Sequence, residues 1–501
     1  MPKRKNKSGT IKRLSTQVVP VIGMSLAVEA ELFEMMQRLG VVRSESYNKL
    51  GSVNHWGIDW RKAYSFVRSF RTPESLGLPS KLMEWTVSDV AKAISAQQAA
   101  CIEALGKILH KRFPGQENKK RRNECYKQLS SPSFVDNPFL HRIVRKQFQR
   151  GHSSTRNQIV YQQGGYSCKR ISRHTYQLEL AGLHRGKRNR ILVRSNRKIT
   201  GQIRVIYNLQ LQRFEIHFLV NYGVVNVSSE RRSLGVDKGY TEAFYDSDGR
   251  THGRGLGKLA SRKSVRVAWP FGHRIAKKNR NRGKLWALHR KLKKIDPAKS
   301  ARILHNNLSR KTENRRYRKD QAGILAIIGT ASKSLFKGES LKVFAEDLTQ
   351  PMKSKRQSKA MSRKLNSWMK GAMRDSLQKW ANWTGSVVSE IQPSYTSQID
   401  SFSGTLLGVR KGDRFTRFNG VVLQADHNAA RNILARGTDK DISRFMTRVE
   451  VQAILLRRTA RFLKGMDLSL VDAVKLGWLD SKHSRNQAFK ELLIGMSGTS
   501  R

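Results

Sequence analysis

The apolar residues in the first third of the chain recur with the period of amphipathic helices. After an apolar stretch at 16–23 that predicts a strand, the pattern becomes helical at Met24, and Gly40 is the predicted C-cap of this helix. A second, longer helix is predicted from Leu82 to Phe113, where a Pro-Gly pair ends it. We therefore interpret 25–170 as a mainly helical domain.

Beyond the helical domain the hydrophobic period changes to two, which is typical of strands. The clearest alternation runs through Ile203, Val205 and Tyr207 and repeats after a short turn. An antiparallel β module is predicted over 171–229, with 1–24 supplying one more strand. We expect the module to close into a small β-barrel, so that the helical domain is an insertion into it.

The second half of the chain alternates strand and helix patterns, which predicts an α/β domain. It begins with a strongly basic block, 273–320, whose apolar residues keep helical spacing and predict an antiparallel helix pair, apolar inside and basic outside. The further predicted elements are strands at 340–348 and 386–391, helices at 365–383 and 425–435, and, past residue 440, one amphipathic helix before a weaker polar tail.

The charge balance narrows the classes of function. The chain has 501 residues with 97 Lys and Arg against 37 Asp and Glu, a formal net charge of +60. Such an excess of positive charge repels itself and works against a compact fold, which argues against an enzyme of small metabolites. A polyanionic partner would neutralise the charge. Because 38% of the residues are hydrophobic, the chain can still build cores and is not a disordered basic tail. Nucleic acid is the expected partner, with 273–320 as a candidate contact.

Cysteine usage and the lack of long apolar segments predict a cytoplasmic protein. The three cysteines, Cys101, Cys125 and Cys168, are scattered and form no C-x-x-C pair, which is typical of a reducing compartment. The sequence has no run of about 18 apolar residues, and its basic start lacks the apolar segment of a secretory signal. We expect no membrane partner and no small-molecule substrate.

Three acidic residues stand in apolar surroundings at the ends of predicted elements. Asp237 follows Leu-Gly-Val, Glu346 ends Lys-Val-Phe-Ala, and Asp426 opens a helix. Burying a carboxylate is unfavourable unless a cation or hydrogen bonds compensate. Each acid taken singly also fits a structural role, such as a turn, an ion pair or a helix N-terminus. A shared pair of Mg²⁺ ions would explain all three, since Mg²⁺ prefers hard oxygen ligands and two ions promote phosphodiester hydrolysis.

The order of these acids is that of an RNase H-like nuclease, and the motifs around them resemble one family. The motifs are Gly235-Val-Asp-Lys-Gly239, Phe344-Ala-Glu-Asp-Leu348, Pro393-Ser-Tyr-Thr-Ser-Gln398 and Ala425-Asp-His-Asn-Ala-Ala-Arg-Asn-Ile433. Together they resemble the RuvC-like domain of TnpB, a family of transposon-associated RNA-guided nucleases. Compact type V CRISPR effectors descend from this family. The last motif is the most specific, and the resemblance covers roughly 233–436.

The resemblance implies an α+β multidomain, bilobed fold. A helical recognition lobe would be inserted in a β-barrel wedge domain, and an RNase H-like (RuvC) α/β nuclease domain would follow. The corresponding ranges are 25–170 for the recognition lobe, 1–24 and 171–229 for the wedge domain, 230–390 and 421–501 for the nuclease domain, and 391–420 for an insert that resembles a zinc ribbon.

The resemblance also implies an activity and partners. Asp237, Glu346 and Asp426 match the catalytic, metal-binding D, E and D of the family. The expected enzyme is an RNA-guided DNA endonuclease that uses two Mg²⁺ ions, for which Mn²⁺ can substitute. Its expected partners are a guide RNA and a target DNA with a short flanking motif, read by base pairing and duplex shape. The alternatives are a nuclease-silent RNA-guided DNA-binding protein, acting in repression or transposition, and a structural RNA-binding protein without a guide.

One segment departs from the family pattern. The family usually carries two Cys pairs between Tyr-Thr-Ser-Gln and the last Asp, whereas 399–420 contains no Cys. Because structural zinc needs about four Cys or His ligands, no zinc is expected. The segment is predicted to hold itself by glycine turns and by packing Leu406, Phe415 and Phe418. Loss of the ribbon favours the nuclease-silent alternative, and the intact acidic triplet favours an active enzyme.

Several other residues allow both a functional and a structural interpretation. Trp56, Trp60, Phe66 and Phe70 would stack on bases if exposed, although aromatic residues at this spacing are more often part of a core. His427, next to the last acid, would either touch the scissile phosphate or orient a ligand, or simply lie on the helix surface. The free cysteines are interpreted as core residues.

Overall fold

The computed structural model describes residues 10–115, 117–148, 153–184, 186–226, 231–267, 271–309, 311–348 and 369–497. The chain divides into two compact units, Lys12–Val224 and Val225–Arg501. Helices and sheets occur in both, as the predicted α+β multidomain class requires. Among the described residues, no helix combines the length and apolar composition that crossing a membrane requires.

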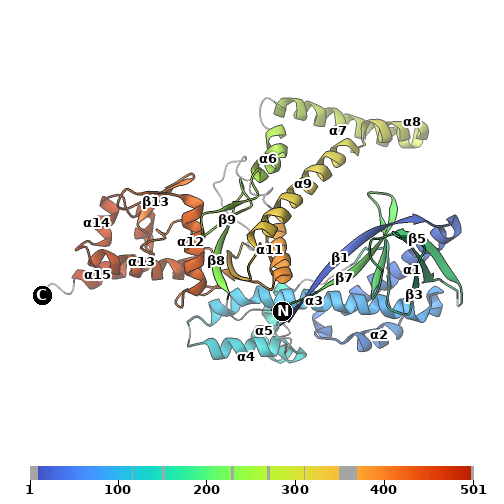
Figure 1. Cartoon of the computed structure of the whole chain (residues 1–501), viewed down its shortest axis with the longest axis horizontal. Coiled ribbons are helices and arrows are strands. Elements are labelled where there is room, and N and C mark those ends of the chain that lie inside the picture. The colour runs from blue at the N-terminus through green and yellow to red at the C-terminus, as the bar shows by residue number, and fades with distance from the viewer. Residues whose placement is uncertain are drawn as a thin grey trace. The chain divides into compact units, whose positions relative to one another are not determined.

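The first unit combines a helical segment with a seven-stranded sheet (Figure 1). Its helices are α1 (Leu26–Leu50), α2 (Trp60–Arg68), α3 (Ser80–Arg112), α4 (Lys119–Leu129) and α5 (Pro138–Gln147). Its strands are β1 (Thr10–Gly23), β2 (Gln158–Tyr161), β3 (Tyr166–Arg170), β4 (Thr175–Ala181), β5 (Arg188–Arg194), β6 (Ile203–Asn208) and β7 (Arg213–Asn226). The strand order is β2-β6-β7-β1-β5-β4-β3, so the N-terminal strand β1 lies in the middle of the sheet.

The sheet differs from the prediction in its extent and its closure. Strands β2 and β3 fall inside 25–170, so the helical segment ends at Gln147. The described strands form an open sheet with β2 and β3 at its edges, and the predicted closed barrel is wrong. Closure is not needed to bury the apolar face, because helices α1, α2 and α3 share one core with the sheet.

The predicted C-cap at Gly40 is also wrong, since α1 continues to Leu50. A Cβ atom at position 40 would lie 2.7 Å from Arg156 Cγ, so this glycine allows the segment before β2 to pack closely against the helix.

The second unit is built on a five-stranded mixed sheet. Its strands are β8 (Arg232–Lys238), β9 (Phe244–Asp246), β10 (Thr251–His252), β11 (Leu341–Glu346) and β12 (Val387–Ile391), in the order β10-β9-β8-β11-β12. Strands β8, β11 and β12 run parallel, and β9 is antiparallel to β8. Helix α12 (Ala425–Thr438) packs against β8, while α9 (Lys311–Leu335) and α11 (Lys370–Thr384) share a core with the sheet. The predicted strands are confirmed, and the start of the helix predicted at 365–383 lies outside the described residues.

The basic block 273–320 is helical but does not form the packed pair that was predicted. Helices α6 (Leu256–Val267), α7 (Phe271–Ile295) and α8 (Pro297–Arg302) lead into α9, and Figure 1 shows α7 and α9 diverging from their junction near α8. Leu288 and Ile295 are 42% and 71% exposed, so the apolar stripe of α7 is not buried against α9.

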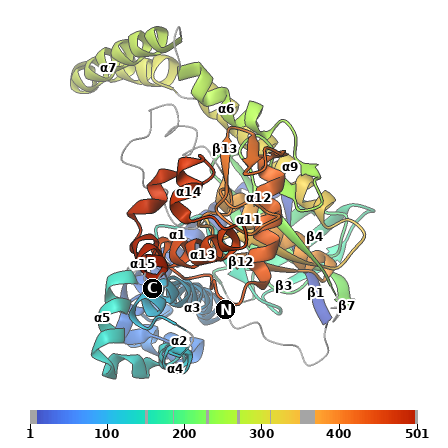
Figure 2. The ribbon, with the colours of Figure 1, turned by 90° about the vertical axis from the view of Figure 1, so that its left-hand side faces the viewer.

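A small sheet and three helices complete the second unit. The sheet consists of β13 (Gly408–Lys411), β14 (Arg414–Arg417) and β15 (Val422–Gln424), and the helices are α13 (Arg448–Lys464), α14 (Leu470–Lys475) and α15 (Gln487–Ser497). These elements gather beside α12 (Figures 1 and 2). Leu406 and Phe415 are buried and Phe418 packs against this core, as predicted. The region past residue 440 is therefore a helical support for the insert rather than a polar tail.

Candidate active site

The parallel pairing of β8 and β11 brings two of the predicted acids side by side. Ala345 pairs with Val236, so the next residues, Glu346 and Asp237, lie at the same edge of the sheet. Leu234 and Val236 point into the core shared with α9 and α11. Because side chains alternate along a strand, Asp237 points to the opposite face, which α12 covers.

The third acid reaches the same place from α12. Asp426 lies in the first turn of this helix, which approaches β8 very closely. A Cβ atom at Gly235 would lie 2.1 Å from the Ala430 carbonyl oxygen, so only glycine permits this approach. Asp237, Glu346 and Asp426 together line one cavity of about 560 Å³.

Burial disfavours the charged form of the two strand acids, and repulsion by neighbouring acids adds to this effect at Asp237. Burial, followed by the charges of Glu346 and Asp426, raises the pKa of Asp237 well above its ordinary value. Burial also raises the pKa of Glu346, and a hydrogen bond donated by Thr396 Oγ1 to its carboxylate opposes that rise. An added divalent cation would favour the charged form of both carboxyls.

Asp426 has a cation of its own, which comes from the insert. Arg410 Nη2, on β13, lies 2.8 Å from Asp426 Oδ1, and the two side chains are 30% and 29% exposed. Such a half-exposed ion pair is worth about 0.2–1 kcal/mol. The start of α12 adds a favourable dipole for the same carboxylate.

The donor chemistry of this cavity fits hard divalent cations, which bind carboxylate oxygens. Among the residues described, no three His, Cys, Asp or Glu side chains are close enough to form a ready metal site. Thr396 contacts one oxygen of the Glu346 carboxylate, and Arg410 contacts one oxygen of the Asp426 carboxylate. The second oxygen of each carboxylate could bind an ion while these contacts hold the carboxylate in place.

Sequence reasoning missed three polar residues at this site. Lys238 is 4% exposed and donates from Nζ to the Glu346 carbonyl oxygen at 2.8 Å, which fixes the ends of β8 and β11 together. Burial lowers the pKa of Lys238. Thr396 belongs to the Tyr-Thr-Ser-Gln motif, so that motif was a usable signal. Arg410 lies in the cysteine-free segment, where no sequence motif indicates that it belongs to the site.

Most of the aromatic, histidine and cysteine residues that allowed two interpretations have a structural role. Trp56 is 4% exposed and belongs to a core, which excludes it as a stacking platform, whereas Phe70 is 37% exposed. The His427 ring stacks on Tyr245, with centroids 6.0 Å apart, and its Nε2 lies 3.2 Å from the Ser247 carbonyl oxygen. His427 therefore fastens the start of α12 to the β9 region. The three cysteines are free, and two of them are buried.

Residues 371–433 match the family model described as Cas12f1-like, TNB domain. This span includes most of α11, then β12, the insert and the first turns of α12. The match confirms the predicted resemblance to TnpB and the compact type V effectors.

The chain is also similar to solved structures of RNA-guided proteins. Cas12f1, in a complex with sgRNA and target DNA, is 12% identical over 86% of this chain and 100% of its own, with a TM-score of 0.37. The mini-RNA-guided endonuclease CRISPR-Cas_phi3 is 11% identical over 85% and 92%, with a TM-score of 0.42. AacC2c1, in a binary complex with sgRNA, is 10% identical over 85% and 90%, with a TM-score of 0.38. A comparison with curated proteins returns no match.

Proposed function

We propose that this protein is an RNA-guided DNA endonuclease with a single RuvC-like active site. The observation that carries the proposal is the convergence of Asp237, Glu346 and Asp426 on one cavity, from two parallel strands and a helix N-terminus. The match of 371–433 to a Cas12f1-like domain supports the same class of nuclease.

The acids would hold two Mg²⁺ ions, which, when bound, supply Lewis-acid chemistry and lower the pKa of a water molecule for attack on phosphorus. The other steps belong to the chain itself. Asp237 would supply a carboxylate to the ions, Thr396 orients the Glu346 carboxylate, and Lys238 keeps the two strand ends together. A product with a 3′-hydroxyl is expected.

The expected partners are a guide RNA and a target DNA. A net charge of +60 favours binding to a large polyanion, and a guide RNA with its paired target is one. In the first unit, a cavity of about 440 Å³ is lined by Arg43, Lys92 and Arg204 against the single acid Asp89. We assign this basic cavity to the flanking motif of the target, because its polar lining suits base edges and phosphates.

Cleavage by an Asp237→Ala variant tests the assignment. The variant should bind guide RNA nearly as well as the wild type and lose Mg²⁺-dependent cleavage of a matched target. Asp375→Ala, which removes an exposed acid of α11 outside the cavity, is the matched control and should cut normally. Cleavage that survives in the Asp237 variant would show that the site is elsewhere.

One observation favours the nuclease-silent alternative, namely the absence of Cys from the insert. A silent protein would bind a target through its guide and show no Mg²⁺-dependent cutting at any concentration. Sequencing the RNA that copurifies tests the remaining alternative, since a defined species with a variable end excludes a structural RNA-binding protein without a guide.

A further inference from the structure

The insert between β12 and α12 contains no Cys or His, the residues that close zinc ribbons. No Cys or His occurs between Gln392 and Gln424, although this span lies within the match to the Cas12f1-like domain. Zinc ribbons are closed by Cys and His ligands. The donors of this insert therefore do not fit zinc, and other contacts must close it.

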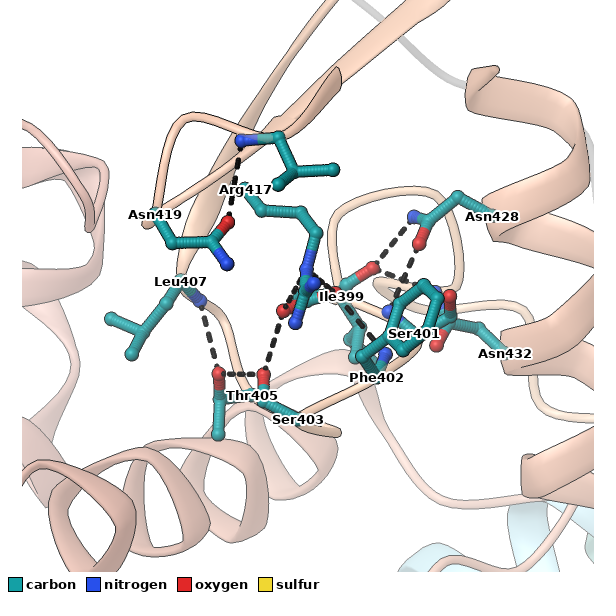
Figure 3. Close-up of polar contacts among 12 residues, drawn as sticks. Ile399, Ser401, Phe402, Ser403, Thr405, Leu407, Arg417, Asn419, Asn428 and Asn432 are labelled. Carbon is teal, nitrogen blue, oxygen red and sulfur yellow. Dashed lines mark hydrogen bonds and ion pairs between the residues drawn. The ribbon is translucent and has the colours of Figure 1, made fainter. Parts of the chain in front are cut away.

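A buried carboxylate stands at the centre of the insert. Asp400 is 0% exposed and accepts from Arg417 Nε, which lies 3.1 Å from each of its oxygens. It also accepts from the Phe402 backbone N–H at 3.1 Å and from Ser403 Oγ at 3.0 Å. Figure 3 shows the Arg417 side chain reaching from its strand into the loop that carries Phe402, Ser403 and Thr405. One carboxylate thus ties this loop to β14.

Two asparagines of the most specific motif fasten the same loop to α12. Asn428 and Asn432 are four residues apart and share one face of the helix. Asn428 donates from Nδ2 to the Ile399 carbonyl at 2.8 Å and accepts from the Ser401 N–H at 2.9 Å. Asn432 donates from Nδ2 to the carbonyls of Ile399 at 2.7 Å and Thr396 at 2.9 Å (Figure 3). The motif therefore clamps the start of the insert to the helix that bears Asp426.

The closed insert reaches two of the three acids. At its start Thr396 donates to Glu346, and on β13 Arg410 contacts Asp426 at 2.8 Å. Strand β13 pairs with β14, the strand that carries Arg417. Fixing Arg417 therefore fixes the hairpin that presents Arg410 to the cavity.

We propose that the Asp400–Arg417 pair is a metal-free clasp that takes the structural role of zinc in the insert and positions Thr396 and Arg410 at the acids. The first half of the proposal stands on the contacts within the insert. The second half rests on the proposed function. Asp400 and Arg417 are positioning residues, because they act through Thr396 and Arg410.

Metal analysis of the full-length protein tests the first half. Purified protein should hold far less than one zinc ion per chain by mass spectrometry, and a zinc chelator should leave its melting temperature unchanged. A stoichiometric zinc ion whose removal lowers the melting temperature would overturn the clasp.

A double-mutant cycle tests the same contact directly. Arg417→Met leaves the Asp400 carboxylate buried without its cation, so it should lower the melting temperature and speed amide exchange across 400–424 by at least about tenfold. Adding Asp400→Asn should restore part of both losses. Arg414→Met, an exposed change on the same strand, is the matched control. Additive effects, or an Arg417 variant that behaves like the control, would overturn the clasp.

Binding of Mn²⁺ alone, followed by electron paramagnetic resonance, tests the positioning role without cleavage. Ser403→Ala removes one hydrogen bond to Asp400 and leaves no unpaired charge, so the insert stays folded. Arg417→Met, and more weakly Ser403→Ala, should reduce Mn²⁺ affinity by about 3–10-fold, with no change for Arg414→Met. Unchanged or tighter binding would overturn the positioning role and leave the clasp intact. Failure of the proposed nuclease function would show instead in the Asp237→Ala cleavage assay.

Discussion

The half-buried carboxyl of Asp237, which neighbouring acids repel, makes the stability of the folded protein depend on pH. Burial together with Glu346 and Asp426 raises the pKa of Asp237 well above its ordinary value. In the unfolded chain the same carboxyl is ionised above about pH 4. Between that pH and the raised pKa the folded state binds more protons than the unfolded state, so stability falls as the pH rises. Ionised Asp237 therefore destabilises the metal-free fold.

Asp237→Asn should accordingly stabilise the metal-free protein at neutral pH. The amide cannot ionise, so the variant should match the wild type in stability near pH 4 and become increasingly more stable toward pH 7. Each 1 kcal/mol gained in free energy of unfolding should raise the melting temperature by roughly 2–4 °C. Thermal melts in EDTA across this pH range provide the measurement. Asp375→Asn, which neutralises an exposed acid of α11 outside the cavity, is the control and should give no gain. Equal melting of the Asp237 variant and the wild type at pH 7 would contradict the repelled carboxyl.

The three acids could be predicted from sequence, and their partners could not. Asp237, Glu346 and Asp426 are acids in apolar runs at element ends, which is a local signal. Arg410 is one of 97 Lys and Arg residues, and it meets Asp426 only because the insert folds back on α12. Thr396 lies within a motif, but nothing in its spacing reveals which acid it contacts.

At the scale of elements, a second set of charges ties together the strands that carry and flank Glu346. Arg444, between α12 and α13, donates from Nε to Asp347 at 3.0 Å and also contacts Glu390. Asp347 directly follows β11, and Glu390 belongs to β12. One arginine thus joins the ends of the two strands next to the catalytic candidates.

Arg444→Met should therefore destabilise the second unit. Asp347 and Glu390 have side chains that are only 2% and 8% exposed, so each would lose the Arg444 cation inside the protein, while Arg374 would remain paired with Glu390. We expect a loss of about 2–4 kcal/mol, measured by urea unfolding. Arg457→Met, an exposed change on α13, should stay within about 0.5 kcal/mol of the wild type. Equal unfolding midpoints for the two variants would rule out this tie between the strands.

Periodicity predicted which faces of the elements are apolar, but not what covers them. The strands at 340–348 and 386–391 were found because short apolar runs bounded by turns have few other interpretations. The closed barrel was wrong because the same alternating strands can be covered by helices such as α1 and α3. The local pattern predicts a helix end at Gly40, whereas this glycine allows Arg156 to pack against the helix, and no local pattern encodes that contact.

At the scale of the whole molecule, composition predicts a polyanionic partner without locating it. Helix α7 is the clearest candidate surface, because its sequence contains no Asp or Glu that could neutralise its cations locally. Lys284, Lys291 and Lys294 are all exposed on it. The +60 total alone would have been equally consistent with an even spread over the surface.

Replacing Lys284, Lys291 and Lys294 with Gln should weaken RNA binding and also reduce its dependence on salt. Each phosphate that a lysine no longer neutralises should lower the slope of log affinity against log salt by about 0.7–0.9, so the triple variant should have a slope smaller by roughly 2–3. Fluorescence anisotropy with the copurifying RNA at several salt concentrations measures this. A triple Gln variant at Lys464, Lys475 and Lys490, which are exposed in the C-terminal helices, removes the same charge and should keep the slope. Counterion release depends on which lysines contact phosphates, so the two variants should differ in slope. An equal fall in both would show that net charge rather than α7 governs binding.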